Sequence, residues 1–368
     1  MENDKRPIRI LTNFPGLKQT LLPEAPARFD YLNEDLGAIQ FLARCFRSDL
    51  LILNTDAKRV MLACALKWLM PLSPSRFKII SVDLIVRTPK SVRGHLKTFL
   101  QKLLFKRVHR FILYFKDLRG CERFYGIASD RAIFVPFKVN ALESIQRRVA
   151  KEDLSGGEYV MCAGRTMRDV KTFVEAMRRA GCSAILHQQP KDLMAAHGTP
   201  AWDGDLPANV KLVIDDSNSH EVFLDFVAKA RLVVIPRFKD DIGPAGIATY
   251  LIAMAMNKCV IISDGPGVGD VLTNEAVIVR PEDADELADQ IRLLWNDDAL
   301  RNEIAGRGQR YAATLGGDDR LYRDILRVSF ESLFEKRRRT GRRHDVAVRH
   351  TLPMTAAIGV RQTSEDAK

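Results

Sequence analysis

The chain has 368 residues, 46% of them hydrophobic and 28% charged, and its 57 lysines and arginines exceed its 46 acidic residues by 11. This composition is ordinary for a globular protein and excludes a collagen-like, mucin-like or wholly disordered chain. The length exceeds what one core usually supports, so we expect two domains. The longest apolar stretches, such as residues 60–72 with Lys67 inside, are shorter than the about 18 apolar residues that a membrane-spanning helix needs.

The first half of the chain alternates strand and helix patterns. It begins with polar residues that lead directly into a short apolar run, without the apolar core of an export signal, so we expect a cytoplasmic protein. Short apolar runs predict strands, and a longer periodic run predicts a helix. The strands are predicted at residues 8–11, 50–54, 78–82, 111–114 and 132–135, and the helix at 58–69. This alternation favours a mainly parallel sheet with covering helices.

A basic segment lies between the third and fourth predicted strands. Eight lysines and arginines from Arg87 to Arg110 are interleaved with apolar residues that recur at spacings of three and four, which predicts a basic amphipathic helix from about Leu96 onward. The pattern has three interpretations: a surface helix whose apolar face meets the core, a helix at an anionic membrane surface, or a nucleic-acid-binding surface. No nucleic-acid-recognition motif accompanies the charge, so we expect no nucleic-acid partner.

The second half restarts the alternation after a polar connection at residues 138–157 that ends in glycines. Its predicted strands are residues 159–163, 184–187, 210–214, 232–235, 260–263 and 276–279, and its predicted helices are 170–180, 221–230, 246–256, 284–295 and 298–313. We therefore predict an N-terminal domain at residues 1–150, which the resemblance described below implies to be the acceptor side, and a second domain at 151–315.

Two further segments follow the second domain. An amphipathic pattern at residues 318–334 predicts a helix, and we expect the segment 316–335 to cross back to the first domain. Residues 336–350 hold seven lysines and arginines against one aspartate, so the tail at 336–368 is predicted to be a disordered basic extension. Such a tail can strengthen attachment to an anionic surface.

The six cysteines are scattered along the chain without any Cys-x-x-Cys pair, and several lie inside apolar runs. A free thiol in such a run behaves as a small hydrophobic side chain. We therefore interpret the cysteines as reduced core residues that form no disulfide and bind no zinc.

The second domain carries two glycine-containing motifs, a loop that opens a helix and a turn that follows a strand. An apolar strand ends in Pro236, the loop Gly243-Pro-Ala-Gly246 opens a helix, and a further strand ends in a glycine-containing turn. Gly164 and Arg165 lie in the turn that follows the first strand of this domain, and this turn continues to Asp169. Residues 159–313 thereby resemble the donor-binding region of the GT-B glycosyltransferases of the family-4 type, the glycosyl transferases group 1. The first half resembles them only in general architecture.

The resemblance implies an α/β fold of two Rossmann-like, doubly wound domains that face a cleft. It implies a hexosyltransferase-type enzyme that moves a sugar from a nucleotide-diphosphate sugar to an acceptor hydroxyl, with retention of configuration and without a metal or other cofactor. The basic first domain favours a glycan or lipid-linked acceptor, as in cell-envelope polysaccharide or glycolipid assembly at the inner face of the membrane.

The physical logic of a diphosphate site supports the same residues. A helix N-terminus offers unpaired, positively polarised N–H groups to a diphosphate. Glycines before the helix allow close approach, and Arg165 can form a forked contact with the phosphates. Arg168 can do the same or can pair with Asp169, and the glycines can also mark a loop-to-helix transition without a ligand. The predicted donor-binding residues are Gly164, Arg165, Arg168, Asp240, Asp241, Gly243, Ala245, Gly246 and Thr249. Next to Thr249, Tyr250 is expected in the core.

One departure from the family pattern weakens this interpretation. The resemblance implies two glutamates that hold the sugar and the ribose, but Pro244 and Ile252 occupy their positions. Neither side chain accepts a hydrogen bond, and Asp240 and Asp241 are the nearest carboxylates that can substitute. An alternative hypothesis is therefore a catalytically degenerate GT-B-fold protein that binds a glycan, a lipid or a protein partner.

Other motifs give weaker signals. Asp203-Gly-Asp205 has ligands that suit Mg²⁺, but it lies in a loop away from any predicted strand end, so we expect no metal there. The glycines from Gly265 to Gly269 predict a tight turn beside the donor cleft, because the context of a dinucleotide fingerprint is lacking. The sequence identifies no catalytic base, and it holds neither a nucleophile elbow nor a P-loop.

Overall fold

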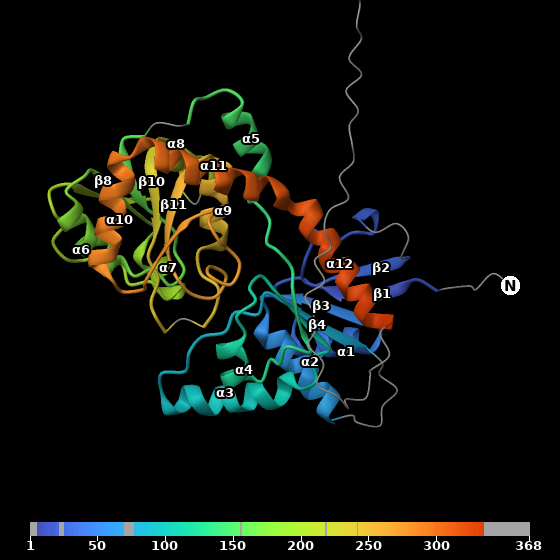
Figure 1. Ribbon diagram of the computed structural model, residues 1–368. Coiled ribbons are helices and arrows are strands. Elements are labelled where there is room, and N and C mark those ends of the chain that lie inside the picture. Colours follow the sequence, from blue (N-terminus) through green and yellow to red (C-terminus); the bar gives the residue numbers. More distant parts are fainter. Residues whose placement is uncertain are drawn as a thin grey trace, which may run out of the picture. The chain divides into compact units, whose positions relative to one another are not determined.

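The computed structural model describes residues 6–21, 26–69, 77–154, 157–217, 219–240 and 242–334. The strands in these ranges form two six-stranded sheets, one from the first half of the chain and one from the second (Figure 1). The predicted α/β fold is thus confirmed. Asp241 and the basic tail predicted at residues 336–368 lie outside the described residues.

The first sheet has the order β2-β1-β3-β4-β5-β6, and all of its neighbours pair in parallel. Successive residues of its third strand belong to different core clusters, with Leu50 and Ile52 in one and Leu51 and Leu53 in the other. Because side chains alternate along a strand, both faces of this sheet are buried. The strands are β1 (Ile8–Thr12), β2 (Ala27–Tyr31), β3 (Leu50–Asn54), β4 (Lys78–Val82), β5 (Arg110–Leu113) and β6 (Ala132–Phe134).

The second sheet has the order β12-β11-β10-β7-β8-β9 and is also parallel throughout. In this order the direction of strand addition reverses between β7 and β10, and the crevice at such a point is where open α/β sheets bind ligands. The strands are β7 (Tyr159–Cys162), β8 (Ala184–Gln188), β9 (Val210–Ile214), β10 (Ala230–Ile235), β11 (Cys259–Ser263) and β12 (Val277–Val279).

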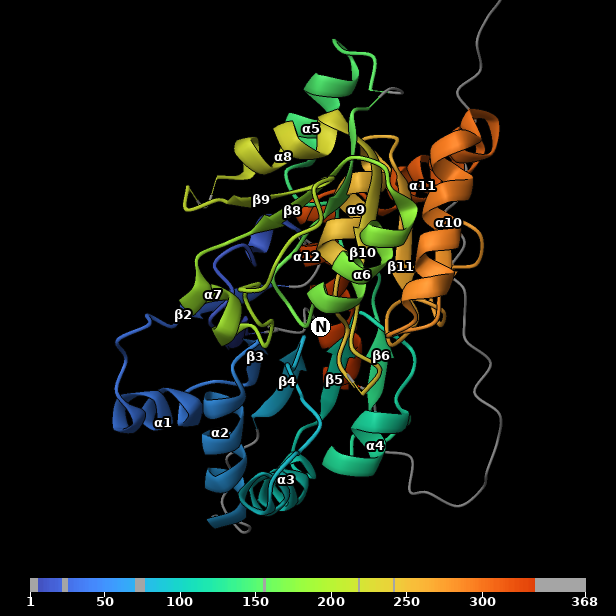
Figure 2. The ribbon, with the colours of Figure 1, turned by 90° about the vertical axis from the view of Figure 1, so that its left-hand side faces the viewer.

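Helices cover both sheets. On the first sheet, buried residues of four helices join one core cluster with β1, β3, β4 and β5 (Figure 2). These helices are α1 (Ala38–Phe46), α2 (Ala57–Leu69), α3 (Val92–Phe105) and α4 (Arg119–Tyr125). On the second sheet, α6, α10 and α11 share one cluster with the strands, whereas α8 and α9 share another. The second set is α6 (Val170–Ala180), α7 (Lys191–Ala196), α8 (His220–Lys229), α9 (Ile247–Ala255), α10 (Ala284–Asn296) and α11 (Asp298–Leu315).

The last described helix, α12 (Asp318–Phe334), packs against elements of the first sheet. The Tyr322 ring meets Phe14 edge-on with centroids 4.8 Å apart. At the end of the helix, Lys78 Nζ donates hydrogen bonds to the carbonyls of Ser332 and Leu333 at 2.8 and 2.6 Å. A cation at a helix C-terminus is favourable because the last carbonyls lack partners within the helix.

Two expectations from the sequence, one for the polar connection and one for the basic helix, are corrected. The polar connection at residues 138–157 contains a helix, α5 (Leu142–Val149), in which only Ile145 is buried, so it lacks the apolar repeat that would have revealed it. Three apolar residues of the predicted basic helix, Leu96, Phe99 and Leu100, are exposed on α3, so they do not meet the core as the interpretation of an ordinary surface helix expects.

The six cysteines are free, and five of them are buried. Burial raises the pKa of Cys45, Cys64 and Cys121 to about 12, so these thiols stay protonated near neutral pH. No helix within the described ranges is long and apolar enough to cross a bilayer.

Asp83 follows β4 in a left-handed backbone conformation, with φ of 47°. Burial raises the pKa of its carboxyl group from 3.8 to about 6. The folded protein therefore binds a proton more tightly than the unfolded chain, and an ionised Asp83 lowers stability above pH 6 but not below 3.8. We expect Asp83→Asn to raise the free energy of unfolding by about 1–3 kcal/mol at pH 8 and to lose this gain near pH 4. Urea unfolding of the parent and the variant at both pH values measures the difference in the free energy of unfolding. An equal increase at both pH values would contradict the explanation.

Candidate functional site

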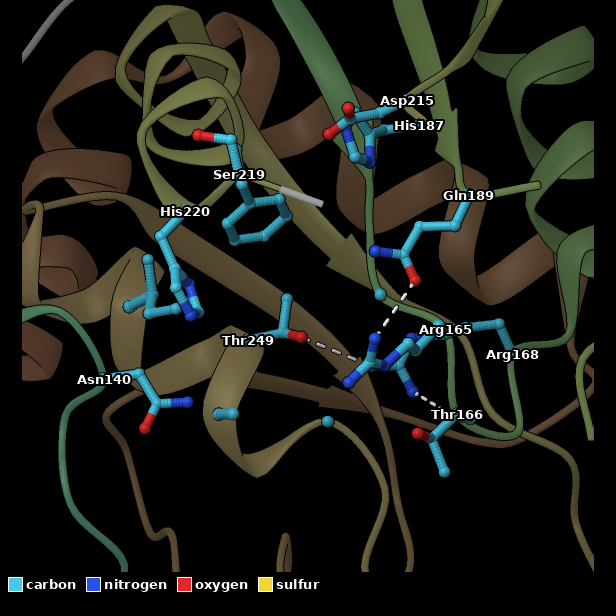
Figure 3. A pocket seen from close by; sticks show the side chains of 15 residues that line it. Asn140, Arg165, Thr166, Arg168, His187, Gln189, Asp215, Ser219, His220 and Thr249 are labelled. Atoms are coloured by element: carbon cyan, nitrogen blue, oxygen red, sulfur yellow. Dashed lines mark hydrogen bonds and ion pairs between the residues drawn. The ribbon is translucent and has the colours of Figure 1, made fainter. Parts of the chain in front are cut away.

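A pocket of 460 Å³ lies in the second half of the chain, where four neighbouring strands of the second sheet end. It is lined by the turn after β7, by residues that follow β8 and β9, and by the first turns of α8 and α9 (Figure 3). The pocket therefore lies over the point between β7 and β10 at which the strand order reverses, which is the expected place for a ligand in such a sheet.

The turn after β7 supplies two of the predicted site residues. Gly164 adopts a φ of 99°, and a Cβ atom there would lie 2.3 Å from Arg168 Nη2, so only glycine fits. The Arg165 side chain is exposed and lines the pocket, and its Nη1 donates a hydrogen bond to Gln189 Oε1 at 3.3 Å (Figure 3). This guanidinium group remains accessible from the pocket.

Arg168 forms the floor of the pocket, with 2% of its surface exposed. Its guanidinium group donates to the carbonyls of Ala163 at 2.8 Å and Thr166 at 2.6 Å, and to Thr249 Oγ1 at 3.5 Å. Asp169, which the sequence offered as its partner, caps α6 by accepting from the Thr172 amide at 3.1 Å. Arg168 thus ties the turn after β7 to α9 and adds positive charge beneath the pocket.

The N-terminus of α9 opens into the same pocket. Gly246 is its N-cap residue at a φ of 97°, and no side chain caps the helix there. Ala248 and Thr249 in its first turn line the pocket, so the first amides of the helix lie beside Arg165 and Arg168. The expectation that Tyr250 belongs to the core is confirmed, since it is 2% exposed and its hydroxyl donates to the Gly267 carbonyl at 3.1 Å.

Three predicted residues lie away from the pocket wall. Gly243 and Ala245 are buried behind it, and the exposed Asp240 is bound through its backbone carbonyl to the Thr88 hydroxyl. The fully buried Arg237 holds this loop, because its guanidinium donates to the carbonyl of Gly243 at 2.9 Å and to that of Pro266 at 3.1 Å. The two carbonyls come from different loops, so Arg237 binds them together.

The glycine-containing turn after β11 is tight, as predicted, and is stabilised by its own carboxylates. Asp264 Oδ1 accepts from the amides of Gly265 and Gly269 at 2.7 and 3.2 Å. Asp270 Oδ1 accepts from the Gly267 amide at 2.7 Å, while its Oδ2 accepts from the amides of Lys116 and Asp117 after β5 at 2.5 and 2.7 Å. These amides therefore have partners and do not form an anion site.

The far end of the pocket holds a buried pair that the sequence did not predict. His187 at the end of β8 and Asp215 after β9 are 5% and 8% exposed, with Nε2 3.3 Å from Oδ2. Burial lowers the pKa of His187, and Asp215 offsets part of this effect. Burial alone would raise the pKa of Asp215, but hydrogen bonds from Ser217 and the neighbouring His187 together outweigh it, and the pKa is lowered. The pair is therefore a neutral imidazole beside a carboxylate at neutral pH.

A signal for this pair was present in the sequence. His187 is the last residue of the predicted strand 184–187, Asp215 directly follows the predicted strand 210–214, and parallel strands place their carboxyl ends at one edge of a sheet. The sequence did not reveal that β8 and β9 are the two strands beyond β7, which is what brings His187 and Asp215 to this pocket.

The departure from the family pattern is visible in the pocket wall. Ile252 lines the pocket and is 4% exposed, so it presents an apolar surface where the resemblance implies a carboxylate. Polar side chains of the pocket wall also come from Asn140, Ser219 and His220, which lie across from Arg165 (Figure 3).

Metal ligands do not gather in the described part of the chain: no group of three histidine, cysteine or acidic side chains there is arranged to hold an ion. Asp203 and Asp205 are exposed in the loop before β9 and do not line the pocket.

Comparison with known proteins identifies the fold. Residues 204–311 match the family model of the glycosyl transferases group 1. The structure of HepE from Anabaena in complex with UDP is similar, with a TM-score of 0.60 at 13% identity over 88% of this chain and 100% of that chain. A glycosyltransferase from Rickettsia africae gives a TM-score of 0.59 at 14% identity over 90% of this chain and 100% of that chain.

A third structure, sucrose-phosphate synthase from Thermosynechococcus elongatus, gives a TM-score of 0.58 at 16% identity and covers 80% of this chain and 76% of that chain. No curated protein matches the sequence. The fold is that of the GT-B glycosyltransferases, and the resemblance predicted from the sequence is confirmed. Within that class, the matched segment is that of the glycosyl transferases group 1, and it includes α9 and its N-terminal loop.

Proposed function

We propose that this protein transfers a sugar from a nucleotide-diphosphate sugar to an acceptor hydroxyl. The observation that carries the proposal is the meeting of the uncapped N-terminus of α9 with Arg165 in one pocket. Helix amides and a guanidinium group are both favourable partners for a diphosphate. The similar structures of HepE contain UDP and glucose, which supports a nucleotide sugar as the ligand.

The proposed mechanism stabilises the leaving group. Negative charge accumulates on the diphosphate as the glycosidic bond to the sugar breaks, and the amides at the start of α9 together with Arg165 are placed to receive it. No metal is required by this arrangement, because helix and guanidinium supply the positive charge. Retention of configuration follows from the resemblance alone, and we assign no catalytic base.

The nucleoside is proposed to lie toward the ends of β8 and β9. There the Phe223 ring offers an apolar wall, 5.6 Å between centroids from His187, and the polar groups of His187, Asp215 and Ser219 surround it. Because Ile252 cannot bind ribose hydroxyls, we propose that Asn140 and His220 do so from the pocket wall.

This assignment predicts the effect of Asn140→Ala. The substitution removes two donors and one acceptor from the pocket wall, so we expect the affinity for the nucleoside diphosphate to fall by about tenfold. Isothermal titration measures the affinity. His220→Asn at the start of α8 serves as a comparison, and an unchanged affinity in Asn140→Ala would remove Asn140 from the ribose site.

Titration with a panel of nucleotide sugars and nucleoside diphosphates tests the proposed function itself. The full-length protein is expected to bind one class of nucleotide and to transfer or slowly hydrolyse the matching sugar. Binding without any turnover would favour the second candidate, a GT-B-fold binding protein. That candidate is supported by one observation, the apolar Ile252 and Pro244 in place of two carboxylates. Failure to bind any nucleotide would overturn the proposal.

The acceptor is proposed to be a glycan or a lipid-linked saccharide of cell-envelope polysaccharide or glycolipid assembly, used at the cytoplasmic face of the membrane. The excess of 11 basic residues supports an acidic or membrane-bound acceptor. Incubation of the protein with labelled nucleotide sugar and extracted lipids tests this, since label in the organic phase is expected.

A further inference from the structure

Helix α3 packs on the protein with its polar side. Thr98 and Gln101 are 6% and 8% exposed, and with the fully buried Phe105 they form the buried side of α3, a helix that packs against α2 and α4. The apolar side faces away from the protein: Val92, Leu96, Phe99 and Leu100 are 87%, 62%, 58% and 50% exposed. This is the reverse of an ordinary surface helix, whose apolar stripe meets the core.

Basic side chains flank this apolar stripe on both sides. At about 100° per residue, Arg93 and Lys97 project on one side of the stripe, and Lys102 and Lys106 project on the other. Nine lysines and arginines and no acidic residue occur between residues 84 and 116. The apolar stripe is thus surrounded by positively charged side chains.

The apolar surface continues beyond the helix. Ile85, which lies shortly before α3, is 58% exposed, and Trp68 and Leu69 at the end of α2 are 46% and 81% exposed. Helices α2 and α3 pack together (Figure 2), and the Arg107 guanidinium lies 4.5 Å from the centre of the Trp68 ring. Tryptophan side chains are enriched at the boundary between lipid head groups and acyl chains.

We propose that the exposed face of α3, together with Ile85 and the end of α2, docks on a bilayer that contains anionic phospholipid. The apolar stripe enters the boundary between head groups and acyl chains, and the flanking lysines and arginines bind the lipid phosphates. This inference is independent of the nucleotide pocket, which lies at the second sheet. It identifies a surface by which the protein reaches a lipid-linked substrate.

Charge and polarity favour lipid over other occupants. A second copy docked through the same face would bring two cationic surrounds together, and like charges at an interface are costly. A nucleic acid would use the cations but would leave Leu96, Phe99 and Leu100 without an apolar partner. An anionic bilayer satisfies both parts of the surface.

Vesicle flotation of the full-length protein tests the proposal. Vesicles of pure phosphatidylcholine are compared with vesicles that contain roughly one third phosphatidylglycerol. The protein is expected to float with the anionic vesicles. Leu96→Ser combined with Phe99→Ser is expected to lower the partition coefficient by about tenfold or more, because two large apolar groups are lost. Arg93→Glu combined with Lys97→Glu is expected to lower binding to anionic vesicles with a reduced salt dependence.

The matched control is Ile214→Ser on β9, which removes a side chain that is 62% exposed, as Leu96 is, but lies on the second sheet. It is expected to leave flotation unchanged. Nucleotide binding by the Leu96→Ser, Phe99→Ser variant should equal that of the parent, which separates this inference from the proposed function. Flotation that resists the apolar substitutions, or self-association that they abolish in the absence of lipid, would overturn the proposal.

Discussion

Arg168→Met is expected to lower the free energy of unfolding by about 3 kcal/mol or more and to abolish nucleotide binding. The guanidinium group donates to the carbonyls of Ala163 and Thr166 and to the Thr249 hydroxyl from a position that is 2% exposed. Methionine keeps the apolar stem of arginine but has no donor, so each buried carbonyl loses its partner at a cost of about 1–3 kcal/mol. Urea unfolding and isothermal titration measure the two effects.

Arg168→Lys tests the role of geometry. An ammonium group keeps the positive charge but cannot reproduce the planar fork that bonds both the turn after β7 and α9, so most of the loss of stability should remain. Arg178→Met on the exposed side of α6 is the matched control, because it removes an arginine whose side chain is 50% exposed. A change within about 0.5 kcal/mol is expected there. Equal effects at both positions would show that burial of Arg168 is unimportant.

Arg165→Ala is expected to reduce the affinity for a nucleoside diphosphate by about 10- to 100-fold and to leave stability nearly unchanged. Its side chain is exposed and makes one hydrogen bond of 3.3 Å, to Gln189, so folding depends little on it. A charge-assisted contact with phosphate is worth about 1.5–3 kcal/mol, which gives the expected loss. Isothermal titration of the parent and the variant measures the difference.

The matching nucleoside without phosphates provides the control for Arg165. If Arg165 binds the diphosphate, the parent and the variant should bind the nucleoside equally well. A parallel loss for nucleoside and nucleotide would instead mean that the turn after β7 has been disturbed. Arg165→Lys should retain part of the affinity, because it keeps the charge without the fork.

The sequence predicted those parts of the fold that consist of apolar runs. Strands such as β3 and β11 are buried on both faces, and each predicted strand overlaps one of the structure. The edge strand β2 was not predicted, because Ala27–Tyr31 is partly or fully exposed and has no apolar run. Helix α5 was missed for a similar reason, since its sequence is mostly polar.

The candidate site was predictable only where local chemistry shows it. Glycines that adopt left-handed conformations, here Gly164 and Gly246, are recognisable in the sequence, as is Arg165 next to Gly164. His187 and Asp215 meet only because β8 and β9 are neighbours in the sheet, and no local pattern contains the strand order. The amphipathic pattern of α3 was evident, but periodicity cannot tell which side of a helix meets the protein.

Arg237 connects two loops at the ligand-binding edge of the second sheet. One rigid, planar group bonds the backbone before α9 to the turn after β11. Because Asp270 in that turn accepts hydrogen bonds from the amides of Lys116 and Asp117, the connection extends to the loop after β5. Two sets of hydrogen bonds thereby join the segment that precedes α9 to a strand end in the other half of the polypeptide.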